Sequence, residues 1–136
     1  MKNLTVTDYP IGEVNLTVTK DDLASSLGSS SDFFPDVFST SKMVALMEIA
    51  ASRVLKEDLL QNECSVGIYI SVNHISATCI GSNVKAKALL IDIENKIYTF
   101  NIQAFDELGL IGEGIHKRFV VDTKRFEKGA LRKISL

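Results

Sequence analysis

The chain has 136 residues, of which 46% are hydrophobic and 24% charged, and its formal net charge at pH 7 is −2. This composition predicts one globular domain spanning residues 1–136 and excludes a disordered chain. No apolar run reaches the roughly 18 residues that a membrane span requires, so we expect no membrane partner. The first ten residues hold one lysine and no apolar block, and we therefore predict a cytoplasmic protein.

The two cysteines, Cys64 and Cys79, give no sign of a disulfide or of a metal site. They lie fifteen residues apart, form no CxxC motif and have no histidine at metal-ligand spacing. We expect two reduced thiols, no metal ion and no cofactor.

Charge is distributed unevenly along the chain. Residues 117–136 contain seven Lys or Arg and two Asp or Glu, a net charge of +5, whereas the first 116 residues carry −7. A basic tail can contact phosphates, but the solvated face of a last helix is the simpler interpretation. Because the rest of the chain is acidic, we do not expect it to bind nucleic acid.

Two short elements are predicted before the longest helix. Residues 13–19 alternate apolar and polar side chains, which is typical of a half-buried strand. Residues 19–28, with paired acids near the start and a glycine at the end, predict a short helix.

Residues 38–55, FSTSKMVALMEIAASRVL, predict one long helix. Ser39 or Thr40 can cap it, and Pro35 ends the extended segment that precedes it. From Met43 to Leu55 apolar residues recur at helical spacing and cover most of the circumference. We therefore expect this helix to be buried on most of its sides.

The second half of the chain predicts strands. Residues 64–84 contain no charged residue, and Val66, Ile68, Ile70 and Val72 alternate with small or polar residues, so these four should share an apolar face. Three further strands are expected at about 84–92, 96–105 and 110–121, followed by a closing helix or tail at 123–133.

The turns between these strands are short, and short turns join antiparallel neighbours, so we expect a four-strand antiparallel meander. A flat sheet would cover only one stripe of a helix that is apolar on most sides. The predicted fold is therefore of the α+β class, with a long central helix wrapped by a curved antiparallel sheet.

One acid interrupts the apolar helix. Glu48 lies two turns after Thr40 on the same line, roughly 12 Å away at about 1.5 Å per residue. We expect at least half of Glu48 to be buried, which requires a partner, a proton or a wet cavity. A surface ion pair with Arg53 or Lys56 is an equally good interpretation.

His74 takes the next inward position after Val72, so an imidazole replaces an apolar residue on the face turned toward the helix. A lone inward histidine is more often a satisfied core residue, but opposite a half-buried Glu48 it resembles the partner of a base. Gly112 and Gly114 leave one face of the last strand bare, either for a ligand or for a tight sheet bend.

Three stretches carry a family resemblance: FPDVFSTSKMVALMEIA, SVGIYISVNHISATCIGSNVKAKA and LGLIGEGIHKRFVVD. With their spacing, they are similar to the fluoroacetyl-CoA thioesterase-like branch of the hotdog-fold thioesterases, over about residues 34–126. Two positions depart from the family pattern. Ser31 stands where the fluoroacetyl-specific member has a second aromatic, and Cys79 replaces a proline.

The resemblance implies hydrolysis of a short-chain acyl-CoA by a homodimer whose sheets join edge to edge, with active sites near the subunit interface. By position, the catalytic residues would be Thr40, Glu48 and His74, with Glu48 as nucleophile or general base. The substrate-binding positions carried over by the resemblance are Phe34, Gly67 and Arg118, the arginine having no assigned role.

Two other functions are compatible with this fold. A non-catalytic acyl-CoA-binding module would bind the thioester without releasing a thiol. A dehydratase acting on hydroxyacyl thioesters is a weaker alternative, because the residues resemble those of hydrolases.

Overall fold

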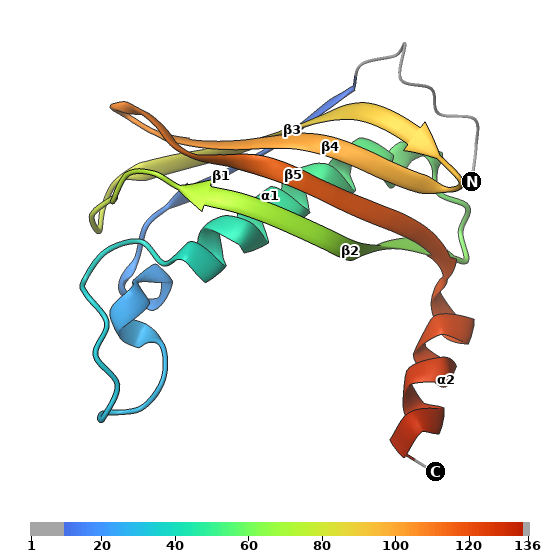
Figure 1. Cartoon of the computed structure of the whole chain (residues 1–136), viewed down its shortest axis with the longest axis horizontal. Coiled ribbons are helices and arrows are strands. Elements are labelled where there is room, and N and C mark those ends of the chain that lie inside the picture. Colours follow the sequence, from blue (N-terminus) through green and yellow to red (C-terminus); the bar gives the residue numbers. More distant parts are fainter. Residues whose placement is uncertain (1–9, 135–136) are drawn as a thin grey trace.

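The computed structural model describes residues 10–134 and shows a curled antiparallel sheet over one long helix (Figure 1). Residues 1–9, which contributed to the expectation of a cytoplasmic protein, lie outside the described part. The strands are β1 (Ile11–Thr17), β2 (Glu63–His74), β3 (Asn83–Glu94), β4 (Ile97–Asp106) and β5 (Gly109–Asp122). The helices are α1 (Thr40–Leu55) and α2 (Thr123–Ile134), with short 3-10 turns at Lys20–Asp22, Ala24–Ser26 and Lys56–Asp58.

All strand pairs are antiparallel, and the order across the sheet is β1-β3-β4-β5-β2. The strands β3, β4 and β5 form the predicted meander. The expectation that β2 begins this meander was wrong, because β2 pairs with β5 and lies at an edge of the sheet. Residues 75–82 connect β2 to β3 without making a hairpin. This connection passes the ends of β5 and β4 and reaches β3, which lies between β1 and β4.

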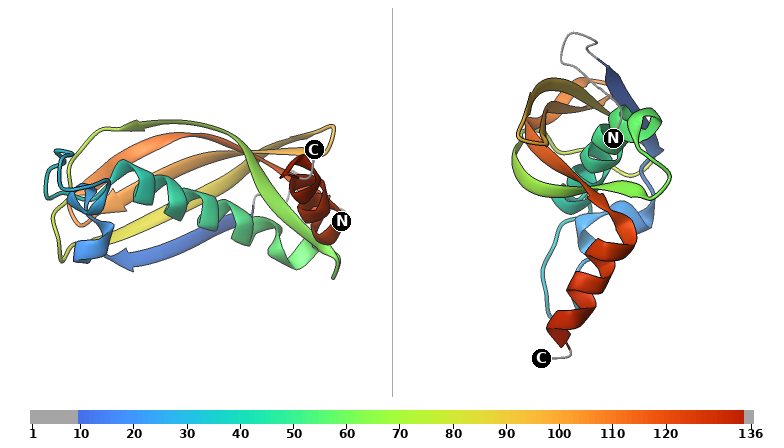
Figure 2. Two further views of the ribbon diagram at one scale, coloured as in Figure 1. Left: turned by 90° about the horizontal axis from the view of Figure 1, so that it is seen from below. Right: turned by 90° about the vertical axis from the view of Figure 1, so that its right-hand side faces the viewer.

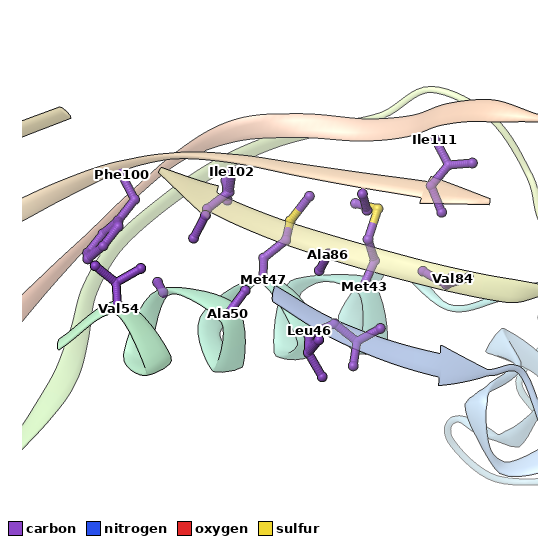
Figure 3. Packing of buried hydrophobic residues seen from close by; sticks show 14 of the residues in the cluster. Met43, Leu46, Met47, Ala50, Val54, Val84, Ala86, Phe100, Ile102 and Ile111 are labelled. Carbon is purple, nitrogen blue, oxygen red and sulfur yellow. The ribbon is translucent and has the colours of Figure 1, made fainter. Parts of the chain in front are cut away.

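The helix α1 begins where the sequence predicts, because Ser39 caps it. The Ser39 hydroxyl accepts a hydrogen bond from the backbone N–H of Lys42 at 3.1 Å. Figure 3 shows Met43 and Met47 reaching from α1 toward the strands. The buried residues of α1 are Met43, Leu46, Met47, Ala50, Ala51, Val54 and Leu55. These residues cover about half of the circumference, and Ile49 and Arg53 are exposed, so the prediction of a helix buried on most of its sides is confirmed only in part.

Small residues let the helix approach the sheet closely. Ala86, Ala88 and Ala104 on β3 and β4 are fully buried in the core. On β1, a Cβ atom added to Gly12 would overlap the carbonyl oxygen of Ala50 in α1. The spacing between β1 and α1 therefore depends on a glycine at this position.

The predicted short helix at 19–28 is instead two 3-10 turns. The Asp22 carboxylate accepts hydrogen bonds from the backbone N–H of Thr19 at 2.8 Å and from its hydroxyl at 2.9 Å. It also lies 3.6 Å from the Lys42 ammonium. These bonds close one tight turn around a buried carboxylate, and the next residue, Leu23, is extended.

A β-bulge changes which side chains of β2 face the helix. The pairing of β2 with β5 shifts register between Gly67 and Tyr69. Before the bulge Gly67 faces α1, since a Cβ added there would lie 3.3 Å from the Glu48 carboxylate. Ile68 in the bulge is 49% exposed. The prediction that Val66 and Ile68 face the helix is therefore wrong. After the bulge, the predicted alternation of inward and outward side chains holds again.

The helix α2 follows β5 directly and stands clear of the sheet (Figure 2). None of its twelve residues is buried by the described part of the chain. Among residues 10–134, no helix is long and apolar enough to cross a membrane.

Replacing Gly12 with alanine tests the close packing of β1 on α1. The added methyl group meets backbone atoms that cannot rotate away, so Gly12→Ala should lower the free energy of unfolding by about 1–3 kcal/mol. Urea unfolding followed by circular dichroism measures this change. Gly112→Ala is the matched control and should cost less, because the two atoms closest to its new Cβ belong to the end of the flexible Met43 side chain and the nearest backbone atom, the Asn73 oxygen, is 3.1 Å away. Unchanged stability of Gly12→Ala would contradict the packing argument.

Candidate active site

Thr40 and His74 are in contact at one end of the sheet. Thr40 is the first residue of α1 and His74 the last of β2, and the Thr40 Oγ and His74 Nδ1 atoms lie 2.8 Å apart. Both line a cavity of about 380 Å³. The other lining residues are Ala24, Phe34, Pro35, Val37, Phe38, Ile75, Ser76 and Ala77. The predicted residues Phe34, Thr40 and His74 therefore share one cavity.

The second nitrogen of His74 is unusual. Its Nε2 atom is buried and has no hydrogen-bond partner in the described part of the chain. Burial lowers the pKa of His74, and a backbone contact with Ser76 opposes this shift. The imidazole is therefore neutral at pH 7, and a buried polar atom without a partner is a natural contact for a substrate.

A second cluster surrounds the guanidinium of Arg118, which is only 6% exposed. Its Nη1 atom lies 3.2 Å from the Glu48 carboxylate and 3.1 Å from His116 Nε2. Its Nε and Nη2 atoms donate to the hydroxyl and the carbonyl of Ser65, each at 2.9 Å. The buried cation is thus matched by one carboxylate and three neutral acceptors.

Glu48 therefore has a partner from another element, not from its own helix. The expected surface pair with Arg53 or Lys56 is replaced by the ion pair with Arg118. Arg53 instead donates to the backbone carbonyl of Glu13 at 2.8 Å. The Glu48 side chain is 46% exposed, in agreement with the expectation that about half of it is buried. One of its oxygens is held while the carboxylate still reaches the surface.

His116 is a site residue that the sequence analysis missed. It is 1% exposed, and its Nδ1 atom lies 2.8 Å from the carbonyl oxygen of Tyr69, to which it must donate. Its Nε2 atom then accepts from Arg118. Burial lowers the pKa of His116, and the charge of Arg118 lowers it further, so the ring stays neutral. The Tyr69 carbonyl and Glu48 oppose the shift.

The alternation along β5 could have revealed this residue. Gly112, Gly114, His116 and Arg118 are spaced two apart and so share one face of the strand. Gly112 faces α1, because a Cβ added there would lie 2.5 Å from the Met43 sulfur. Two polar residues on the face that the glycines bring close to the helix are a detectable signal of a buried polar cluster.

Gly67 lets β2 pack closely against the Glu48 and Arg118 cluster. A Cβ at this position would lie 3.2 Å from the His116 ring, 3.3 Å from the Glu48 carboxylate and 3.5 Å from Arg118. The substrate-binding position assigned to Gly67 by resemblance therefore lies next to the predicted catalytic acid. The glycines Gly112 and Gly114 have different surroundings, since their added Cβ atoms would meet Met43 and the Ser71 carbonyl oxygen. Tight packing is the better explanation for both.

Within one chain, the predicted catalytic residues form two groups. Thr40, His74 and Phe34 lie at the cavity, whereas Glu48, Gly67 and Arg118 lie together two helical turns away. Eight residues of helix separate Thr40 from Glu48, about 12 Å at 1.5 Å per residue. No hydrogen bond joins the two groups within the described part of the chain, and this helical rise is several times the hydrogen-bond reach of about 3 Å.

Sequence comparison supplies relatives of this chain. A model of the fluoroacetyl-CoA-specific thioesterase family matches residues 18–124. The fluoroacetyl-CoA thioesterase of Streptantibioticus cattleyicolor is 38% identical over 93 residues, which are 68% of this chain and 67% of that relative.

Similar solved structures agree with these matches. A mutant of the fluoroacetyl-CoA thioesterase FlK in complex with acetyl-CoA has a TM-score of 0.87 at 30% identity, covering 92% of this chain and 96% of the other. Another FlK mutant, in complex with fluoroacetate and CoA, has a TM-score of 0.82 at 30% identity, with 87% and 97% covered. A thioesterase superfamily member from Thermus thermophilus, 22% identical, shares the fold with a TM-score of 0.84 and 93% and 91% covered.

The curled sheet around one helix and these likenesses define a hotdog-fold thioester hydrolase, which confirms the predicted fold and enzyme class. More narrowly, the chain belongs to the fluoroacetyl-CoA-specific thioesterase family.

Nuclear magnetic resonance can test the state of His116, because the chain has only two histidines. We expect the Nδ1–H tautomer and a pKa below the usual value of about 6.5. As the pH falls below about 6.5, the unfolded chain gains a proton that the folded chain resists, so the free energy of unfolding should decrease. An Nε2–H tautomer, or a raised pKa, would show that the Arg118 cluster is arranged differently.

Proposed function

We propose that the protein hydrolyses short-chain acyl-CoA thioesters at sites shared between two copies of the chain. Glu48 of one copy would act with Thr40 and His74 of the other. The observation that carries this proposal is the arrangement along β2. Glu48 lies beside Gly67, His74 ends the same strand, and the strand has an open edge.

The edge of β2 is suited to pairing with a second copy. It is twelve residues long, and Ile68, Tyr69 and Ile70 are 49%, 51% and 38% exposed. Long apolar edges are usually paired or covered. Antiparallel pairing of two identical strands requires a two-fold axis perpendicular to the sheet, which keeps both α1 helices on the same side. Such a homodimer would have one continuous sheet.

This pairing can complete the site. A two-fold axis that pairs Ser71 with the partner's Ser71 places Gly67 of one copy opposite the partner's His74, because the extra residue in the bulge, Ile68, shifts the pairing by one. The Glu48 carboxylate, which packs directly against the Gly67 backbone, then lies across from the partner's imidazole. Two equivalent sites result, each with an acid from one copy and a cavity from the other.

The chemistry follows from the groups brought together. Glu48 removes a proton from water as the water oxygen attacks the thioester carbonyl carbon. The partner's neutral His74, hydrogen-bonded to Thr40 through Nδ1, donates from Nε2 to the carbonyl oxygen. The N-terminus of the partner's α1 stabilises the negative charge that develops there. The C–S bond then breaks, and the CoA thiolate takes up a proton to leave the free acid and CoA.

Arg118 has a positioning role in this proposal. Its ion pair holds the Glu48 carboxylate oxygen that lies beside Gly67 and so fixes the orientation of the carboxylate. Arg118 itself is fixed by Ser65 and His116 and does not need to reach the substrate.

The size of the cavity favours a small acyl group. Its volume of about 380 Å³ is at the lower end of ligand sites, which span about 300–1,000 Å³. Phe34 lines it, whereas Ser31 does not and instead lies 3.0 Å from the Ser29 hydroxyl. We place this reaction in the cytoplasm, a compartment that keeps thiols such as Cys64 and Cys79 reduced.

Single substitutions test the assigned roles. Glu48→Gln and His74→Ala should each lower the hydrolysis of short acyl-CoAs at least about a hundredfold with the fold intact, which is the usual size of acid–base effects. Release of free thiol across a panel of acyl-CoAs measures the rates. The exposed Glu57→Gln is the control and should retain full activity. Wild-type rates in both site variants, or binding without thiol release by the wild type, would refute the proposal.

Mixed dimers test the shared site directly. Glu48→Gln and His74→Ala chains are each inactive alone, but a dimer of one with the other contains one site with both wild-type residues. Random exchange makes half of the dimers mixed, so an equal mixture should recover about a quarter of the wild-type rate. A site contained within one chain predicts no recovery, and so does a protein that stays monomeric.

A further inference from the structure

The helix α2 has a basic face whose role is unassigned. It contains Lys or Arg at five positions and one acid, Glu127, so its net charge is +5 − 1 = +4. The remainder of the chain carries −2 − 4 = −6. Lys124, Lys128 and Arg132 are spaced four apart and therefore lie on one face of the helix.

These basic residues border a cavity of about 300 Å³ on the surface. It is lined by Lys124, Arg125, Lys128 and Arg132, with Asp122 at the base of the helix. The Asp122 carboxylate accepts hydrogen bonds from the backbone N–H of Arg125 at 3.0 Å and from Asn62 at 2.8 Å. The four cations therefore outnumber the one acid, which is already engaged, and the cavity suits an anion with several charges.

The basic face is too far from the cavity of its own chain to serve it. Asp122, just before α2, pairs with Glu63 at the start of β2, whereas His74 ends that strand. Eleven residues separate the two ends, about 36 Å at 3.3 Å per residue. Figures 1 and 2 show α2 and the segment around residues 20–38 at opposite ends of the sheet, both extending from the same side.

The two-fold axis of the proposed dimer brings these two features together. With Gly67 opposite the partner's His74, the start of β2 lies about 13 Å past that histidine, at 3.3 Å per residue, so α2 stands at the end of the sheet that carries the partner's cavity. Both extend from the same side of the continuous sheet, since the axis is perpendicular to it.

We propose that the basic face of α2 binds the phosphate groups of the CoA whose acyl group occupies the partner's cavity. This inference rests on the proposed function and on the dimer. CoA carries a diphosphate and a 3′-phosphate at the end remote from the thioester, and Lys and Arg clusters are the usual ligands of such groups. Each active site thus takes its nucleotide-binding residues and its cavity from different copies.

A charge-neutralised helix tests this assignment. The variant Lys124→Gln/Lys128→Gln/Arg132→Gln should raise the KM for the best short acyl-CoA about tenfold at low ionic strength and leave kcat unchanged. The difference should shrink toward 1 M salt, where the screening length is about 3 Å. With the matching acyl-pantetheine, which has no phosphate, variant and wild type should have equal KM. Lys96→Gln, in the exposed β3–β4 turn, is the charge control and should behave as wild type.

The outcomes separate this inference from the proposed function. Hydrolysis of neither thioester by the wild type would refute both. Hydrolysis of both thioesters with an unchanged KM of the variant for acyl-CoA would refute only the role of α2. Binding of the wild type to phosphatidylglycerol vesicles that the variant loses, again with unchanged KM, would assign the basic face to lipid headgroups instead.

A mixed dimer tests whether α2 acts on the partner's cavity. One chain carries His74→Ala with a wild-type α2, and the other carries the neutralised α2 with wild-type His74. The only complete site then uses the wild-type helix, so its KM should equal that of the wild type. A raised KM in this mixed dimer would show that α2 serves its own chain and overturn the proposal.

Discussion

A guanidinium removed from water needs a counter-charge and a full set of acceptors, and in this protein Arg118 finds them on three different elements. Glu48 comes from α1, Ser65 from β2 and His116 from β5 itself. Arg118 is buried whereas Glu48 reaches the surface, and the four hydrogen-bonded contacts of the guanidinium together hold these elements in one register. The acid that the proposed chemistry needs is therefore fixed by the same contacts that join the helix to the sheet.

Much of this fold follows from local signals in the sequence. The cap at Ser39 or Thr40, the apolar spacing of α1 and the strands at about 84–92, 96–105 and 110–121 each depend on neighbouring residues, and the structure shows Ser39 as the cap and strands at all three places. The inward position of His74 is confirmed as well. The family resemblance adds site positions that local patterns do not reveal.

Other features could not be read in this way, because they depend on contacts between distant residues. The bulge inserts one residue, so Val66 and Ile68 do not point to the face that simple alternation predicts. The alternating pattern alone does not show where such a bulge lies. The pairing of β2 with β5 likewise depends on the path of residues 75–82. The partner of Glu48 lies 70 residues further along the chain, whereas helical spacing indicates only neighbours such as Arg53 and Lys56.

The open edge of β2 has a consequence for how the enzyme would behave at low concentration. A single chain holds only half of each proposed reaction centre, with the acid at one place and the imidazole about two helical turns away. Dilution below the dimer dissociation constant would then reduce the turnover per chain and leave each subunit folded. The cell could thus adjust hydrolysis through the amount of protein, because the yield of complete centres rises more steeply than the number of chains.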